Sequence, residues 1–303
     1  MNGDLICWSD LNIGGTKIEV KVLTEQGEEL LKLREPTPDN YSDFIALLQG
    51  MLIKVEGNLG AFNKVGLGLP GAVCPKTGLI KNANTLFLNG KNVAKDLSDL
   101  TGKSVTSAND ANCFALSEAV DGAGKGEAVV FGAILGTGCG GGVVINEQVL
   151  VGANAIGGEW GHNPLPSYNP EIDGDIGPCY CGRQHCIEQY ISGTGFADQF
   201  NKKYSKSLNA REIIELYQQG DKEATEAYQL LVDQMARSFA ALTNIIDPHA
   251  IVLGGGLSNV ESLYQDLPAV MKKYVFSKEP SINVQKAKFG DSSGVRGAAW
   301  LAR

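Results

Sequence analysis

The sequence predicts an α/β protein made of two similar halves that face each other across a cleft. Short apolar strands alternate with amphipathic helices along its 303 residues. A strand, a glycine-rich turn and a second strand occur at 5–22 and recur at 128–145, which is the pattern of a duplicated unit. A third glycine-rich turn at 254–256 follows another apolar strand. Together these three observations predict the two-domain α/β class.

The first half contains the pattern of strands and helices that such a unit needs. Apolar and charged residues alternate at 18–22, which predicts a strand with one face exposed. Apolar residues at helical spacing between 44 and 55 predict an amphipathic helix. Short strands are predicted at 65–69 and at 105–106, and the second of these leads into a helix at 111–119.

The second half repeats this order and ends in a helix of small residues. A long helix at 228–246 is predicted to stop at Asp247-Pro248, because proline cannot continue it. A buried strand at 250–253 follows, and a final helix at 294–301 is expected to pack back on the first half.

The domain boundaries follow from this arrangement. We expect a small N-terminal α/β domain at 1–118, joined by the C-terminal helix at 292–303. A larger α/β domain at 119–291 carries a cysteine-rich segment.

Charge and composition exclude several classes of protein. The net charge is −8 and no run of Lys or Arg stands out, so we expect no nucleic-acid partner. The apolar runs are too short to span a membrane, and no basic leader precedes them. Three of the seven cysteines cluster at 179–186, which fits a metal site in a reducing compartment better than a disulfide framework. We therefore expect a cytoplasmic protein.

Glycine-rich turns at the ends of predicted strands indicate phosphate binding. Glycine lets backbone N–H groups approach phosphate oxygens, and a threonine hydroxyl adds a donor. The first turn alone could be an ordinary β-hairpin, but its recurrence favours a nucleotide site in the cleft. Neither a Walker A sequence nor a strand–GxGxxG–helix pattern is present. The candidate residues are Gly14, Gly15, Thr16, Lys17, Gly136, Thr137, Gly138, Gly254, Gly255 and Gly256.

Asn109 and Asp110 follow a predicted strand, where open α/β sheets place ligands. Phosphoryl transfer to a hydroxyl needs a carboxylate that accepts the hydroxyl proton, and Asp110 is the candidate for this role. The alternative is that Asp110 only caps the helix that follows.

The cysteine-rich segment predicts a structural zinc site. Cys179, Cys181 and Cys186 supply three thiolates within eight residues, and His162 lies upstream. Three cysteines and a histidine form a closed tetrahedral set, which is typical of structural rather than catalytic Zn²⁺. His185 is the competing fourth ligand.

Glu159 and Glu188 flank this segment. Carboxylates beside a polyol site accept hydrogen bonds from its hydroxyl groups. The alternative is that both are ordinary solvated side chains, and only their position beside the glycines and cysteines distinguishes them.

These motifs together resemble the ROK family (repressors, open reading frames, kinases), and the resemblance runs over nearly the whole chain. It rests on 14–17, 69–71, 109–112, 136–138, 158–162, 179–188 and 254–256. The resemblance implies the actin-like ATPase (ribonuclease H-like) fold and phosphorylation of a hexose 6-hydroxyl by ATP with Mg²⁺. The segments around 81–84, 88–90, 191–196 and 290–294 are most similar to bacterial fructokinases of the manno(fructo)kinase type. D-fructose is then the expected substrate, with mannose or glucose also accepted; N-acetyl-D-glucosamine kinases are close relatives and the alternative.

The resemblance also implies roles for individual residues. Asp110 would be the general base. The first two glycine turns would hold the ATP phosphates and the third the adenosine side. His162, rather than His185, would complete the zinc site while also binding sugar. The implied sugar-binding residues are Asn84, Asn109, Asp110, Glu159, His162 and Glu188.

Two positions depart from the family pattern. Asn12 stands where the family has an aspartate that organises Mg²⁺, and His185 stands where the family usually has glycine. A sugar-binding pseudokinase is therefore one non-enzyme alternative. A ROK-type regulator is the other, but only thirteen residues precede Gly14, too few for a helix-turn-helix domain. A homodimer is expected from the family alone.

Overall fold

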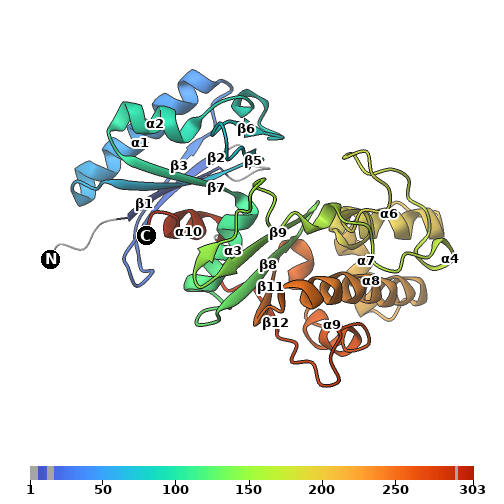
Figure 1. The fold of residues 1–303 in the computed structure, drawn as a ribbon. Coiled ribbons are helices and arrows are strands. Elements are labelled where there is room, and N and C mark those ends of the chain that lie inside the picture. Colours follow the sequence, from blue (N-terminus) through green and yellow to red (C-terminus); the bar gives the residue numbers. More distant parts are fainter. Residues whose placement is uncertain (1–5, 12–16, 291–292) are drawn as a thin grey trace.

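The computed structural model describes residues 6–11, 17–290 and 293–303 of the chain. Two five-stranded sheets with the same topology form its framework (Figure 1). In each sheet the central strand pairs antiparallel with one neighbour and parallel with a later strand on its other side. That later strand pairs parallel with the edge strand. The first sheet runs β3 (Glu29–Pro36), β2 (Lys17–Leu23), β1 (Ile6–Leu11), β4 (Lys64–Leu69), β7 (Ser104–Asn109). The second runs β10 (Gln148–Val149), β9 (Cys139–Ile145), β8 (Val129–Leu135), β11 (Ala250–Gly254), β12 (Val284–Lys286).

The two central helices lie between these sheets (Figure 1). α3 (Asp110–Val120) packs on β8 and β9 of the second sheet, and α10 (Ser293–Trp300) packs on β1 and β4 of the first. α3 and α10 also pack closely on each other, since a Cβ at Gly297 would lie only 1.5 Å from the Cys113 carbonyl oxygen. The predicted return of the C-terminal helix to the first half is therefore confirmed. The exact domain boundaries at 118 and 291 remain a prediction.

The expectation of one exposed face on β2 is wrong. Glu19 and Lys21 are both buried, with 7% and 4% of their surfaces exposed. Their charges are matched within the sheet, because Glu19 accepts a hydrogen bond from Arg34 Nε at 2.8 Å and Lys21 pairs with Glu29 at 3.0 Å. Charged neighbours across the strands, which a single-strand pattern does not reveal, make this burial tolerable.

The predicted amphipathic helix in the first half is α1 (Tyr41–Leu59). Asn40 caps it by accepting a hydrogen bond from the Asp43 backbone N–H at 3.0 Å. Its apolar stripe, including Phe44, Leu48 and Met51, lies in the core of the first half. Shorter elements complete this half: β5 (Ala72–Val73), β6 (Ile80–Lys81), η1 (Leu86–Leu88) and α2 (Val93–Thr101).

The long helix of the second half is α8 (Lys222–Ile246), which begins six residues before the predicted start and ends where predicted. Asp221 caps its first turn, and Asp247 adopts a left-handed conformation at its end. Helices around α8 bury a large core with the second sheet. They and the neighbouring short helices are η2 (Trp160–His162), α4 (Pro170–Asp173), α5 (Glu188–Ile191), α6 (Gly193–Tyr204), α7 (Ala210–Gln218), η3 (Gly256–Asn259) and α9 (Leu263–Met271).

In both sheets, the ends of neighbouring parallel strands bring predicted site segments side by side. Leu69 of β4 pairs with Asn109 of β7, so the turn after β4 lies beside the start of α3. Gly254 of β11 pairs with Ile134 of β8, so the third glycine turn lies beside the second. Among the described residues, no helix is both long and apolar enough to cross a bilayer.

Candidate functional site

Asp110 is the first residue of α3, directly after β7. The cap of α3 is Asn109, whose side-chain oxygen accepts a hydrogen bond from the Asn112 backbone N–H at 2.8 Å. Asn109 is therefore the cap of α3, and Asp110 is not. The Asp110 carboxylate lies at the positive end of the helix, where the backbone N–H groups of Asp110 and Ala111 donate to it.

The surroundings of Asp110 favour its protonated form. Burial raises the pKa of this carboxyl above its ordinary value, backbone N–H groups of Ala111 and Asp110 itself oppose the rise, and the negative charge of Glu159 raises it further. A carboxylate with a raised pKa is a stronger base than a solvated one.

Close backbone packing fixes the position of Glu159. Gly158, just before it, has φ +90°, and a Cβ there would lie 2.4 Å from the Gly141 carbonyl oxygen of β9. Only glycine fits this approach without displacing the strand. Glu159 itself is exposed, so its carboxylate is open to a ligand.

Glu188 links the cysteine-rich segment to the second glycine turn. It is the first residue of α5, and its Oε2 accepts a hydrogen bond from the Cys139 backbone N–H at 2.9 Å. A Cβ at Gly138 would lie 2.7 Å from the same oxygen. The carboxylate of Glu188 therefore rests directly on the turn.

The second and third glycine turns meet, as the fold class requires. The Gly193 N–H donates to the Gly136 carbonyl oxygen at 2.7 Å, which places the start of α6 on the same turn. Gly255 has φ +79°, and a Cβ there would lie 2.9 Å from the Gly136 nitrogen. Thr137 is exposed at the tip of its turn. Backbone groups of two turns and a helix start thus converge here, which suits phosphate oxygens.

The four predicted metal ligands come together. One ligand atom from each of His162, Cys179, Cys181 and Cys186 lies within 4.8 Å of the others. His162 Nδ1 is 3.7 Å from Cys179 Sγ, and the Cys181 and Cys186 sulfur atoms are 3.6 Å apart. Three thiols and an imidazole are the donor set that Zn²⁺ prefers, so these residues fit the ion.

The thiols of this cluster would have to lose their protons to bind a cation. Burial raises the pKa of the Cys186 thiol to about 12. A buried thiol of this kind stays protonated unless a metal displaces its proton. His185 does not compete for the ion, because its ring stacks on Tyr168 at 3.8 Å between ring centroids and its Nδ1 lies 3.1 Å from the Tyr190 hydroxyl.

Tyr180, between two of the cysteines, is a site residue that the sequence analysis missed. Its hydroxyl lies 2.9 Å from His162 Nε2, and its ring packs edge-on against the imidazole with centroids 5.2 Å apart. An aromatic residue between two metal ligands was the only signal available in the sequence.

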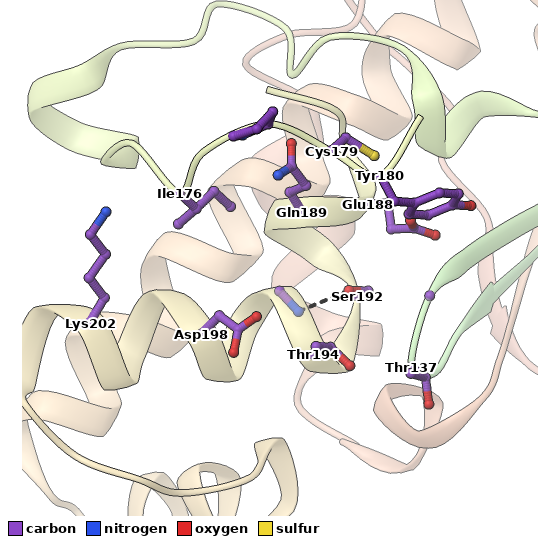
Figure 2. Close-up of a pocket in the computed structure, with 13 residues that line it drawn as sticks. Thr137, Ile176, Cys179, Tyr180, Glu188, Gln189, Ser192, Thr194, Asp198 and Lys202 are labelled. Carbon is purple, nitrogen blue, oxygen red and sulfur yellow. Dashed lines mark hydrogen bonds between the residues drawn. The ribbon is translucent and has the colours of Figure 1, made fainter. Parts of the chain in front are cut away.

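A cavity of about 600 Å³ opens beside Tyr180 and Glu188 (Figure 2). It extends from the second glycine turn along the exposed face of α6. Its polar side chains include Thr137, Glu188, Thr194, Asp198 and Lys202. Thr137 and Gly138 of the second glycine turn and Glu188 are among the residues that line this cavity.

Some predicted site residues form no hydrogen bond with the acidic residues of the site in the described part of the chain, and others lie outside the described residues. Asn84 is exposed in the loop between β6 and η1. Asn89 holds that loop by bonding both the N–H and the carbonyl of Ala83, at 2.9 Å each. No hydrogen bond within the described chain joins Asn84 to the acidic residues of the site. Lys17 is exposed at the start of β2, whereas Asn12, Gly14, Gly15 and Thr16 lie outside the described residues.

Comparison with known proteins identifies the family. The sequence model of the ROK family matches residues 9–303. The chain belongs to the ROK family. It is 40% identical over 294 residues to an N-acetyl-D-glucosamine kinase of Photobacterium profundum, covering 96% of this chain and 97% of the relative. An N-acetyl-D-glucosamine kinase of Haemophilus influenzae is 41% identical over 296 residues, with the same coverage.

Solved structures of ROK proteins share the fold. The ROK hexokinase of Thermus thermophilus has a TM-score of 0.86 and 29% identity, with 98% of this chain and 97% of that chain covered. A ROK family glucokinase of Streptomyces griseus, in complex with glucose and AMPPNP, has a TM-score of 0.75 and 27% identity, with 99% of each chain covered. The predicted ROK sugar kinase with an actin-like ATPase fold is confirmed.

Proposed function

We propose that this chain is an ATP-dependent kinase that phosphorylates the 6-hydroxyl of N-acetyl-D-glucosamine. The observation that carries the proposal is the Asp110 carboxyl, which lies at the start of α3 beside the Asn109 cap and whose pKa is raised by burial. The relatives that are 40 and 41% identical over 96% of the chain support the sugar. Fructose, the first expectation, has no such support and becomes the competing substrate.

The proposed reaction follows from the placement of the carboxylates. The sugar 6-hydroxyl gives its proton to Asp110 as its oxygen attacks the γ-phosphorus of ATP, and ADP leaves with the electron pair of the broken bond. Glu159 and the free oxygen of Glu188 accept hydrogen bonds from other sugar hydroxyls, together with Asn109 and Asn84. Backbone groups at Gly136–Gly138 hold the phosphates, and the first glycine turn would hold them from the other half. Mg²⁺ would neutralise phosphate charge as it does in other kinases.

We also propose that His162, Cys179, Cys181 and Cys186 hold a structural Zn²⁺. The ion would fix the loop that carries Tyr180 and precedes Glu188, so it would act on sugar binding and not on proton transfer. Cytoplasmic location and a homodimer remain predictions from the sequence and the family.

A panel of sugars tests the proposal. ADP release would be measured in a coupled assay with N-acetylglucosamine, glucose, mannose and fructose, each over a range of concentrations. We expect the highest kcat/KM with N-acetylglucosamine. A higher kcat/KM with fructose would return the assignment to the first expectation. Sugar binding without turnover on any of the four would support the pseudokinase or regulator alternative, for which Asn12 is the sequence signal.

A further inference from the structure

Tyr180 is unusually exposed for an aromatic residue that makes a specific polar contact. Its side chain is 84% exposed, yet its hydroxyl is held 2.9 Å from His162 Nε2. It also lines the cavity that contains Glu188 (Figure 2). Exposed rings that line a cavity and present a polar group are typical of ligand-binding surfaces.

The proton of the Tyr180 hydroxyl is free of a protein acceptor when His162 donates to this hydroxyl. His162 directs Nδ1 toward Cys179 and Nε2 toward Tyr180. When Nδ1 is turned to the metal cluster, Nε2 carries the ring proton and donates it to the tyrosine oxygen. The O–H of Tyr180 then needs another acceptor, and no further hydrogen bond of this hydroxyl exists within the described chain. The O–H therefore remains available to a bound molecule.

The other polar groups of the site are mainly acceptors. Asp110, Glu159 and Glu188 are carboxylates that take hydrogen bonds from sugar hydroxyls. A carbonyl oxygen on the substrate has no proton to offer them, so it requires a donor. Tyr180 supplies such a donor on the side of the metal cluster.

The position of Tyr180 corresponds to one part of a hexose ring. Tyr180 and Glu188 line the same cavity, and Asp110 is not among the residues that line it. In a pyranose, carbon 2 lies opposite carbon 5, which carries the reacting 6-hydroxymethyl group. A sugar with its 6-hydroxyl on Asp110 and another hydroxyl on Glu188 would turn its 2-substituent toward the cavity that Tyr180 lines.

We propose that Tyr180 is a specificity-determining residue whose hydroxyl donates a hydrogen bond to the carbonyl oxygen of a 2-acetamido group. The inference rests on the proposed function and deepens it. Glucose has a hydroxyl at carbon 2, which can donate to the carboxylates and does not depend on this donor. Tyr180 thus favours an N-acetylated hexosamine over the free hexose.

The test compares Tyr180→Phe with the wild type on N-acetylglucosamine and on glucose. Calorimetry gives Kd for each sugar, the coupled assay gives KM and kcat, and metal analysis gives zinc per chain. Loss of one net hydrogen bond should raise Kd and KM for N-acetylglucosamine about three- to tenfold. Kd for glucose should change by less than about twofold, with kcat for both sugars and the zinc content unchanged.

Tyr204→Phe is the matched control, because Tyr204 lies at the end of α6 and its hydroxyl bonds Glu226 at 2.8 Å, away from the cluster. It should leave both sugars unaffected. Unchanged or tighter binding of N-acetylglucosamine by Tyr180→Phe would overturn the proposal, as would an equal loss on glucose. Loss of zinc in this variant would also overturn it, since the role of Tyr180 would then be structural.

Binding and turnover separate this inference from the proposed function. A wild type that binds N-acetylglucosamine but transfers no phosphoryl group contradicts the kinase assignment, while calorimetry on Tyr180→Phe still decides the role of Tyr180. A wild type that binds no N-acetylglucosamine overturns both.

Discussion

The start of α3 and the cysteine-rich loop position candidate functional groups by different means. Asp110 stands where β7 passes directly into α3, so regular backbone hydrogen bonds and the Asn109 cap position it. Tyr180 and the three candidate cysteine ligands stand on an irregular loop, where Gly182 and His185 both have positive φ. The loop is closed by backbone hydrogen bonds between Cys179 and Arg183 and between Gly182 and Cys179, at 2.7 and 2.9 Å.

We infer from this difference that the β7–α3 junction holds the reacting group and that the loop recognises the sugar. A reacting group must be held accurately, and a strand–helix junction provides that accuracy without a cofactor. Recognition of sugar substituents varies between relatives, and a loop can change without disturbing the sheets. Changes at the junction should therefore affect kcat, whereas changes at the loop should affect sugar KM and depend on metal.

The largest effect is expected at the junction. Asp110→Ala removes the proposed base, so kcat should fall about 100- to 10,000-fold while the melting temperature stays close to that of the wild type. Asp99→Asn, an exposed carboxylate on α2, is the control and should retain full activity. A near-normal kcat for Asp110→Ala in the coupled assay would remove Asp110 from the base role.

Loss of the metal should be the next largest effect and should fall on the loop. Cys186→Ser removes a buried ligand, so zinc per chain, the melting temperature and sugar affinity should all decrease. Cys74→Ser, at a free cysteine outside the cluster, should change none of the three. Purified wild-type protein without zinc would show that the four ligands do not form the proposed site.

Substitution of Glu188 tests whether the β7–α3 junction and the cysteine-rich loop act independently. Glu188→Gln removes a charged acceptor from the sugar and weakens the bond to the Cys139 N–H beside the second glycine turn. We expect the KM values of both sugar and ATP to rise, each by about tenfold. Glu159→Gln should raise the sugar KM alone. Equal behaviour of the two variants toward ATP would contradict the link between Glu188 and the phosphate turn.

The smallest effect concerns pH. Asp110 must be deprotonated to act as base, so activity is lost as pH falls through its raised pKa. Removing the Glu159 charge lowers that pKa, so Glu159→Gln should move the acid limb of the kcat profile to lower pH. Glu188→Gln should leave the limb in place. A limb that does not move with Glu159→Gln would show that the titrating group is not the one beside Glu159.

Local patterns predicted much of this arrangement. Glycine turns after strands, the Asn109-Asp110 pair and the spacing of the cysteines are each contained within a few residues, so the chain order reveals them. The repeat of strand, turn and strand likewise predicted two similar α/β halves. Helices α4 to α7 were not predicted, and α4 and α5 have only four residues each. The exposed face expected for β2 failed because ion pairs with β3 made burial of its charges possible.

The sequence by itself determined the fold class, the family and the residue types of the site, because these depend on periodicity and on motifs that are short along the chain. Only the tertiary structure decided three further matters. It gave the capping role to Asn109 instead of Asp110, turned His185 away from the metal ligands, and brought Tyr180 to His162 across 18 positions of sequence. Each depends on the direction of a side chain relative to a distant segment, and that direction is set by packing rather than by local pattern.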